Sequence, residues 1–253
     1  MPAEIRREIS DGVMSLTLDR AAKKNAITDA MYGALAAGLN EAAGDDAVRA
    51  VLLRGEGPDF CAGNDIAMFA ASAGGEFDLA GSNTGPFLAA LSSFPKPLVA
   101  AVRGRAIGIG TTLLLHCDLV YVAEDAELTT PFIDLGLVPE AASALLIPAR
   151  IGYIRAFALF ALGERISGSA AVALGLANQA LPADEVDPAA IAAARMLASK
   201  PASALRATKA LMRDAPAIAA ALEADRAAFL AQIATPEAAA AFAAFAAHKR
   251  PAS

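Results

Sequence analysis

Two glycine-bearing segments could place backbone N–H groups around an anion. The first, residues 104–115 (GRAIGIGTTLLL), follows an expected strand and opens a helix pattern, with Gly108 and Gly110 at the turn. The first N–H groups of a helix have no partner within the helix and lie at the positive end of its dipole. Such a turn can bind a phosphate or a developing oxyanion, although many glycine turns only connect two elements.

The second segment, residues 60–66 (FCAGNDI), also comes just after an expected strand and contains small residues and a glycine. It could supply a second backbone N–H, so that both segments converge on one carbonyl oxygen. The first segment is not a P-loop, because no Gly-Lys-Ser/Thr follows it, and it lacks the full dinucleotide fingerprint.

Cysteine and histidine offer little further chemistry. The chain has two cysteines, Cys61 and Cys117, and two histidines, His116 and His248. Neither a disulfide framework nor a zinc site fits this number and spacing. His116 lies in an apolar helix pattern, which indicates a packed core residue, and nothing in the sequence near Cys61 would activate its thiol.

The composition excludes several classes of partner. The net charge of −6 argues against nucleic acid. The mean hydropathy is +0.46, yet no stretch of about 18 apolar residues runs free of charge, Gly or Pro. The start of the chain carries no apolar signal region. These patterns predict a soluble, cytoplasmic protein that does not enter a membrane.

The elements that must position the two segments alternate between strand and helix patterns. A helix is expected over residues 29–43, a loop over residues 71–85, and a helix from Pro139 to about Pro148. Strands are expected at residues 13–18, 50–54, 98–102 and 119–123. The composition shift near residue 197 predicts an α/β core over residues 1–197 and a C-terminal helical oligomerisation region over residues 198–253.

Five motifs in order along nearly the whole chain resemble those of the enoyl-CoA hydratase/isomerase (crotonase) superfamily. They are LDRAAKKNAIT, FCAGNDI, AVRGRAIGIG with TTLLLHCDLVYVAEDA, GERISGSAAVALGLANQAL and FAAHKRP. The resemblance implies an α/β fold, the crotonase (ClpP/crotonase-like) spiral of repeated ββα units with a C-terminal helical region. It also implies an acyl-CoA thioester substrate and a homotrimer or dimer of trimers. No metal and no separate cofactor are implied, since coenzyme A is part of the substrate.

The resemblance also implies the site. The backbone N–H groups that hold the thioester oxygen map to Asn64 and Ile109. The family often has glycine where Ile109 stands, so we expect this side chain to narrow the pocket. The two glutamates that position and activate water in hydratases align with Thr112 and Phe132, and neither is a carboxylate.

A different carboxylate is available at Glu140. Its segment, PFIDLGLVPEAAS, resembles the one that carries the single catalytic glutamate of peroxisome-type Δ3,Δ2-enoyl-CoA isomerases. We expect Glu140 in the first turn of a helix after Pro139, where the helix dipole favours its anion while burial raises its pKa. A first-turn glutamate without catalytic function is the alternative. Asp134 could be a second acid near the pocket, but a cap or an ion pair is the favoured interpretation.

The residues expected to contact the coenzyme follow from the same motifs. They are Lys24, Ala26, Ala62, Asn64, Asp65, Ile66, Ala67 and Lys249. For the lysines, a solvated surface position is an equally good interpretation.

The predicted function is isomerisation of 3-enoyl-CoA to trans-2-enoyl-CoA in fatty acid metabolism, with Glu140 as the base. Three alternatives remain open: hydration of 2-enoyl-CoA, a non-catalytic acyl-CoA-binding protein, and another enolate reaction such as decarboxylation or C–C cleavage.

Overall fold

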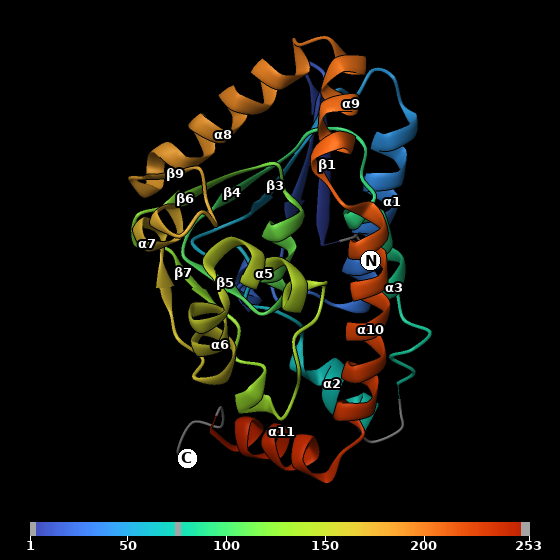
Figure 1. Cartoon of the computed structure of the whole chain (residues 1–253), viewed down its shortest axis with the longest axis vertical. Helices are drawn as coiled ribbons and strands as arrows, with labels where there is room; N and C mark the ends of the chain where they lie inside the picture. Colours follow the sequence, from blue (N-terminus) through green and yellow to red (C-terminus); the bar gives the residue numbers. More distant parts are fainter. Residues whose placement is uncertain (1–3, 74–76, 249–253) are drawn as a thin grey trace.

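A six-stranded sheet forms the centre of the computed structural model, which describes residues 4–73 and 77–248 (Figure 1). Its strand order is β1-β2-β3-β4-β6-β9, and all neighbours are parallel except the antiparallel pair β1–β2. The strands are β1 (Ile5–Ser10), β2 (Val13–Leu18), β3 (Ala50–Gly55), β4 (Leu98–Val102), β6 (Leu119–Ala123) and β9 (Gln179–Leu181). The four predicted strands are therefore confirmed.

A second, three-stranded sheet has the order β5-β7-β8, with β5 and β7 parallel and β7 and β8 antiparallel. Its strands are β5 (Arg105–Ile107), β7 (Glu127–Thr129) and β8 (Ile166–Ser167). β5 follows β4 after two residues, so the chain passes from one sheet to the other at Arg103 and Gly104.

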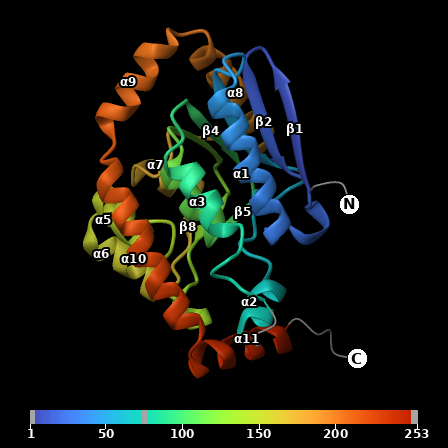
Figure 2. The same cartoon turned by 90° about the vertical axis from the view of Figure 1, so that its right-hand side faces the viewer.

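The centre of the large sheet is covered on both faces. β4 is buried along its whole length, and β3 is buried except at Arg54, as expected of parallel strands between layers of helices. Helix α8 (Ala183–Ala198) packs on β3, β4 and β6, while α1 (Asp29–Gly44) packs on β1, β2, β3 and on α3 (Thr84–Ser92). Figure 2 shows α1 and α3 side by side.

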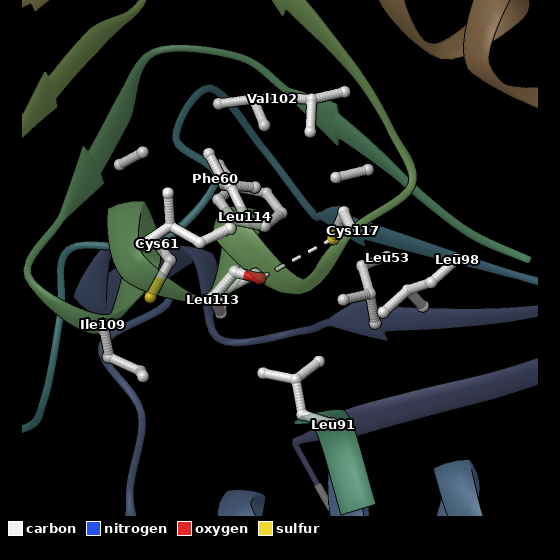
Figure 3. Close-up of a cluster of buried hydrophobic side chains, with 14 of the residues drawn as sticks. Leu53, Phe60, Cys61, Leu91, Leu98, Val102, Ile109, Leu113, Leu114 and Cys117 are labelled. Carbon is white, nitrogen blue, oxygen red and sulfur yellow. Dashed lines mark hydrogen bonds between the residues drawn. The ribbon is translucent and has the colours of Figure 1, made fainter. Parts of the chain in front are cut away.

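A buried cluster joins the sheet to the short helices that follow β5, which are α4 (Ile109–Thr112) and the 3-10 turn η2 (Leu113–His116). Figure 3 shows Phe60, Leu113 and Leu114 packed beside Leu53 and Leu98 of the sheet. The cluster fixes the position of the turn that precedes α4, because its side chains leave the short helices little freedom to move.

The remaining helices lie around the two sheets. They are η1 (Ala21–Lys23), α2 (Ile66–Ala73), η3 (Ile133–Leu135), α5 (Ser143–Ile151), α6 (Tyr153–Ala161), α7 (Gly168–Ala173), α9 (Ala202–Met212), α10 (Ala215–Ile233) and α11 (Pro236–His248). Helix α9 lies at the top of the view in Figure 1, α10 runs along α3 and α5, and α11 crosses below α10 against α2 and the 3-10 turn η3 (Figures 1 and 2).

No single helix in the described part of the chain is long and apolar enough to cross a membrane. Helices α10 and α11, which are bent by 75° relative to each other, reach the length and apolar composition of a membrane span only when they are taken together.

Two predicted boundaries are wrong. The helix expected from Pro139 begins at Ser143, because Ala141 and Ala142 take positive φ angles of 59° and 57° that an α-helix does not allow. The loop expected over residues 71–85 is shorter, since α2 extends to Ala73 and α3 already begins at Thr84. Residues 74–76 lie outside the described part of the chain.

Lys96 ties the end of α1 to the start of β4. It is 4% exposed, and its ammonium group donates to the carbonyls of Ala42, Asp45 and Val48 at 2.7, 2.7 and 2.8 Å. Burial lowers the pKa of Lys96. The three carbonyls belong to the end of α1 and the segment that connects it to β3. A single charged group therefore supplies the hydrogen-bond donors for all three carbonyls.

We therefore predict that Lys96→Met, which keeps the apolar stem and removes all three donors, lowers the free energy of unfolding by about 3 kcal/mol. The exposed Lys200→Met is the matched control and should change it by less than about 0.5 kcal/mol. Urea denaturation followed by circular dichroism measures both, and equal midpoints for the two variants would contradict the structural role of Lys96.

Candidate active site

The two glycine segments lie backbone against backbone. Cys61 forms an isolated parallel bridge with Ala106, in which the Cys61 N–H donates to Arg105 O and the Ile107 N–H donates to Cys61 O, both at 2.9 Å. A Cβ on Gly110 would lie 2.6 Å from Cys61 O, so this position tolerates no side chain. The two glycine segments are therefore adjacent in the structure.

A second bridge orients the N–H of Asn64. The Ile27 N–H donates to Gly63 O at 2.8 Å, and the Asp65 N–H donates to Ile27 O at 2.9 Å. Because backbone groups alternate in direction along an extended chain, the N–H of Asn64 points away from Ile27.

The N–H groups of Asn64 and Ile109 have no acceptor among the described residues. The N–H of Ile109 belongs to the first turn of α4, where such donors are normally free. Two free donors on adjacent segments can hold one developing oxyanion.

Glu140 is the predicted base, and it is 8% exposed. The hydroxyl of Thr112 in α4 donates to Glu140 Oε1 at 2.5 Å. Burial raises the pKa of Glu140 to about 7, against the opposing effect of this hydrogen bond, and the carboxyl of Asp225 in α10 raises it further. The expected placement in a first helical turn is wrong: Glu140 precedes α5, and burial is the first cause of its pKa shift. A carboxyl group with a pKa near neutrality can both accept and return a proton.

A tight turn follows Glu140. The Ser143 N–H donates to Glu140 O at 3.0 Å, and both central residues, Ala141 and Ala142, are left-handed. This is the geometry of a type I′ turn, which normally uses Asn and Gly because a Cβ costs about 1 kcal/mol or more per left-handed residue. The backbone beside the carboxyl is therefore strained.

Two cavities meet at this site. The smaller one, about 70 Å³, is lined by Asn64 and Glu140 and by mostly apolar side chains of the loop before α3, of α3 and of α10: Leu79, Leu88, Leu222, Phe229 and Leu230. Among the described residues that line it, Glu140 is the single carboxylic acid. The larger one, about 290 Å³, is lined by Ala62, Gly63, Asn64, Ile66, Gly108 and Phe132 among others. Asn64 and Phe229 line both cavities.

The residues expected to contact the coenzyme are brought together in part. Ala62, Asn64 and Ile66 line the larger cavity. Lys24 is exposed, and its carbonyl accepts a hydrogen bond from the Ala62 N–H at 2.9 Å. The remaining three described residues, Ala26, Asp65 and Ala67, line neither cavity, and Lys249 lies outside the described part of the chain.

Asp65 has a structural function instead. Its carboxylate accepts from the Ala67 N–H at 3.1 Å and so caps α2. It also accepts from Arg20 Nη1 at 2.8 Å, which fixes residues 18–28 (LDRAAKKNAIT) beside it. The same guanidinium donates to Ala26 O at 3.0 Å. Both contacts hold the turn at the mouth of the larger cavity in place.

Other predicted placements have mixed outcomes. His116 is 1% exposed and Cys61 fully buried, as expected, and burial raises the pKa of the Cys61 thiol to about 12. Ile109 is also fully buried and lines neither cavity, so it does not narrow them. Asp134 is exposed at the rim of the larger cavity.

Four residues of the site have contacts that the sequence did not indicate. Tyr32 of α1 donates to Asn64 Oδ1 at 2.5 Å, and burial raises the pKa of this phenol well above its ordinary value. The sequence shows that Thr112 stands where hydratases have a glutamate, but it does not show that the Thr112 hydroxyl donates to Glu140. Asp225 and Phe229 stand in an alanine-rich helix pattern that marks neither of them.

No group of three or more potential metal ligands occurs among the described side chains. The arrangement instead combines two free backbone donors, one buried carboxyl group and an apolar cavity. It can stabilise an enolate of a bound carbonyl compound and move a proton on it.

Comparisons with known proteins agree with this chemistry. The family model for enoyl-CoA hydratase/isomerase matches residues 8–252. A probable enoyl-CoA hydratase of Rhodobacter capsulatus is 36% identical over 81% of this chain and 79% of its own length. Enoyl-CoA delta isomerase 2 of Rattus norvegicus is 34% identical over 80% of this chain and 52% of its own length, so the chain spans about half of that protein.

Among solved structures, an enoyl-CoA hydratase/isomerase of Pseudoalteromonas atlantica superposes with a TM-score of 0.91, at 34% identity and 99% coverage of both chains. The predicted crotonase fold, with two sheets and C-terminal helices, is thereby confirmed. The chain belongs to the enoyl-CoA hydratase/isomerase (crotonase) family.

Proposed function

We propose that this crotonase-family protein isomerises 3-enoyl-CoA to trans-2-enoyl-CoA, with Glu140 as its base. The observation that carries the proposal is a single buried carboxyl group, with a pKa of about 7, in the cavity that Asn64 also lines. Moving a double bond by one position needs one group that takes a proton and gives it back, which matches this arrangement.

The reaction proceeds through a dienolate. The N–H groups of Asn64 and Ile109 donate to the thioester oxygen of the substrate. The Glu140 carboxylate removes a proton from C2, and the electrons of the C2–H bond pass to the thioester oxygen as the dienolate forms. The protonated Glu140 then returns the proton at C4 while the thioester carbonyl reforms, which leaves the double bond between C2 and C3. Atoms and charge balance without another reactant.

Hydration is the second candidate, since one relative carries a hydratase name. It needs a pair of groups that hold and activate water. At the two aligned positions the chain has Thr112, whose hydroxyl is bonded to Glu140, and Phe132, which is 5% exposed in the wall of the larger cavity. These residues favour isomerisation over hydration.

The coenzyme occupies the larger cavity in this proposal. Ala62, Asn64 and Ile66 face its pantetheine arm, while Lys24, an exposed residue at the end of η1 whose carbonyl accepts from the Ala62 N–H, would bind a phosphate. The acyl chain enters the smaller cavity between α3 and α10, where most lining side chains are apolar.

The protein acts in the cytoplasm as a homotrimer or dimer of trimers in this proposal. Large apolar side chains exposed on and after α6 support the assembly. Tyr153 is 72%, Ile154 84%, Phe157 58% and Leu162 71% exposed. Neighbouring subunits would cover such a surface.

We predict that the purified protein converts trans-3-hexenoyl-CoA and that Glu140→Ala lowers kcat by at least about 100-fold. The assay runs in parallel with trans-2-hexenoyl-CoA, whose hydration removes the conjugated double bond. Water addition that survives in Glu140→Ala would refute the isomerase proposal. Binding of hexanoyl-CoA without turnover of either substrate would support a non-catalytic acyl-CoA-binding protein.

The pH dependence of the reaction tests the state of the base. The value of kcat/KM should rise with pH around an apparent pKa near 7, because Glu140 must be ionised to take the proton. Thr112→Val removes the hydroxyl that lowers this pKa, so the rise should move up by about one pH unit. Thr208→Val, at an exposed position in α9, is the matched control and should leave the profile unchanged. A profile that is equal in all three proteins would contradict Glu140 as the titrating base.

A further inference from the structure

The strained turn after Glu140 determines where its carboxyl group points. Ala141 and Ala142 both hold positive φ angles, and the residue after them begins α5. Strain of about 1 kcal/mol or more at each left-handed alanine persists only where the surroundings hold the backbone in place. The groups that hold this turn therefore control the base.

His116 holds one side of the turn. Its Nε2 lies 2.9 Å from Ala141 O, and its Nδ1 lies 3.2 Å from Arg213 Nη2. A guanidinium can only donate, so Nδ1 is the acceptor and Nε2 carries the proton that it donates to Ala141 O. Arg213 also donates to His116 O at 3.2 Å. Burial lowers the pKa of His116 to about 4, so the ring stays neutral and keeps this tautomer.

Asp225 lies on the other side. The backbone N–H of Ala142 stabilises its carboxylate and so lowers the pKa of Asp225, while burial, the larger effect, raises that pKa to about 6. Asp225 Oδ2 is buried and has no hydrogen-bond partner among the described residues. Asp225 shares the face of α10 with Leu222 and Phe229, which line the smaller cavity. A buried carboxylate oxygen without a partner is costly.

We propose that His116 and Asp225 are positioning residues, which hold the Glu140 carboxyl group in the cavity: His116 bonds the carbonyl of Ala141, and the carboxylate of Asp225 attracts the N–H of Ala142. The inference rests on the proposed function only in taking Glu140 as the base. The two supports come from different parts of the fold: His116 ends η2, and Asp225 belongs to α10. Asp225 has a second effect, because its negative charge disfavours a second negative charge at Glu140 and so strengthens the base.

Few other ionisable groups face Glu140. Tyr32 of α1 and Cys61 after β3 are buried and neutral, because burial raises the pKa of each far above neutrality. Arg226 of α10 lines the same cavity, and its guanidinium donates to Ala80 O at 3.1 Å and lies 3.8 Å from Glu223. On the side of η2, His116 is neutral and Arg213 is bonded to it. Within residues 4–73 and 77–248, Asp225 is the one ionised group that raises the pKa of Glu140.

The first test separates charge from structure at Asp225. Asp225→Asn keeps the shape of the side chain and removes its charge, so the apparent pKa of kcat/KM should fall by about half a unit or more. Glu223→Gln is the matched control, because it removes one exposed charge from the same helix and should leave that pKa unchanged. Asp225→Ala removes both carboxylate oxygens beside the turn and should lower kcat about tenfold while KM changes less than about twofold.

The second test asks whether the donor at His116 matters. His116→Phe keeps the ring volume without a donor and should lower kcat about tenfold at nearly constant KM. His116→Gln places an amide N–H near the position of Nε2 and should restore kcat to within about threefold of the wild type. Circular dichroism checks that each variant is folded. If His116→Phe fails to fold, His116→Gln alone decides. A kcat of His116→Gln more than about tenfold below that of the wild type would overturn the positioning function of His116.

A third measurement separates this proposal from the proposed function. The carboxyl carbon of Glu140 is titrated by 13C NMR in protein labelled at glutamate, with Glu140→Gln used to assign the signal. A lower pKa in Asp225→Asn supports the inference even if neither enoyl-CoA substrate is turned over, in which case only the isomerase proposal fails. An unchanged pKa in Asp225→Asn, or equal kcat in the Phe and Gln variants of His116, overturns it.

Discussion

The site depends on the backbone pairing of the segment after β3. This segment is bonded on one side to Ile27 and on the other to β5, so its peptide groups are fixed in direction by their neighbours. A donor that is held by paired neighbours needs no reorganisation when charge develops on a ligand, which is what makes such donors effective. The close approach of Gly110 to Cys61 O is the condition for this arrangement, since any side chain there would separate the two segments.

Burial is the main cause of the raised pKa of Glu140, which lines a cavity together with Asn64. A glutamate in water is ionised well below neutrality, and an isolated one in an apolar cavity binds its proton more tightly. Glu140 lies between these limits because Thr112 stabilises its anion while burial and Asp225 disfavour it. The balance leaves the group near the point where it can release and take up a proton with equal ease, which suits a reaction that does both in one cycle.

Much of the fold and part of the site could be predicted from the sequence. The strands at residues 50–54 and 98–102 are short apolar runs, and such runs predict buried strands by their composition alone. The segments that carry Asn64 and Ile109 were found through motifs, because close backbone contacts require glycines at fixed positions. The turn after Glu140 was missed since two alanines give no sign of positive φ, and Pro139 indicated a helix start instead. Asp225 could not be found, because its function arises from a contact between residues far apart in the chain.

The wall that α10 contributes to the smaller cavity has an evolutionary consequence. Leu222, Phe229 and Leu230 stand on a helix that follows the α/β core, whereas the two backbone donors belong to the core itself. Exchange of side chains along that helix face would alter which acyl groups fit without disturbing the segments that stabilise the anion. A family built in this way can diversify its repertoire of substrates by drift at the apolar positions of one helix, while Asp225 on the same helix and the donors in the core stay under separate selection.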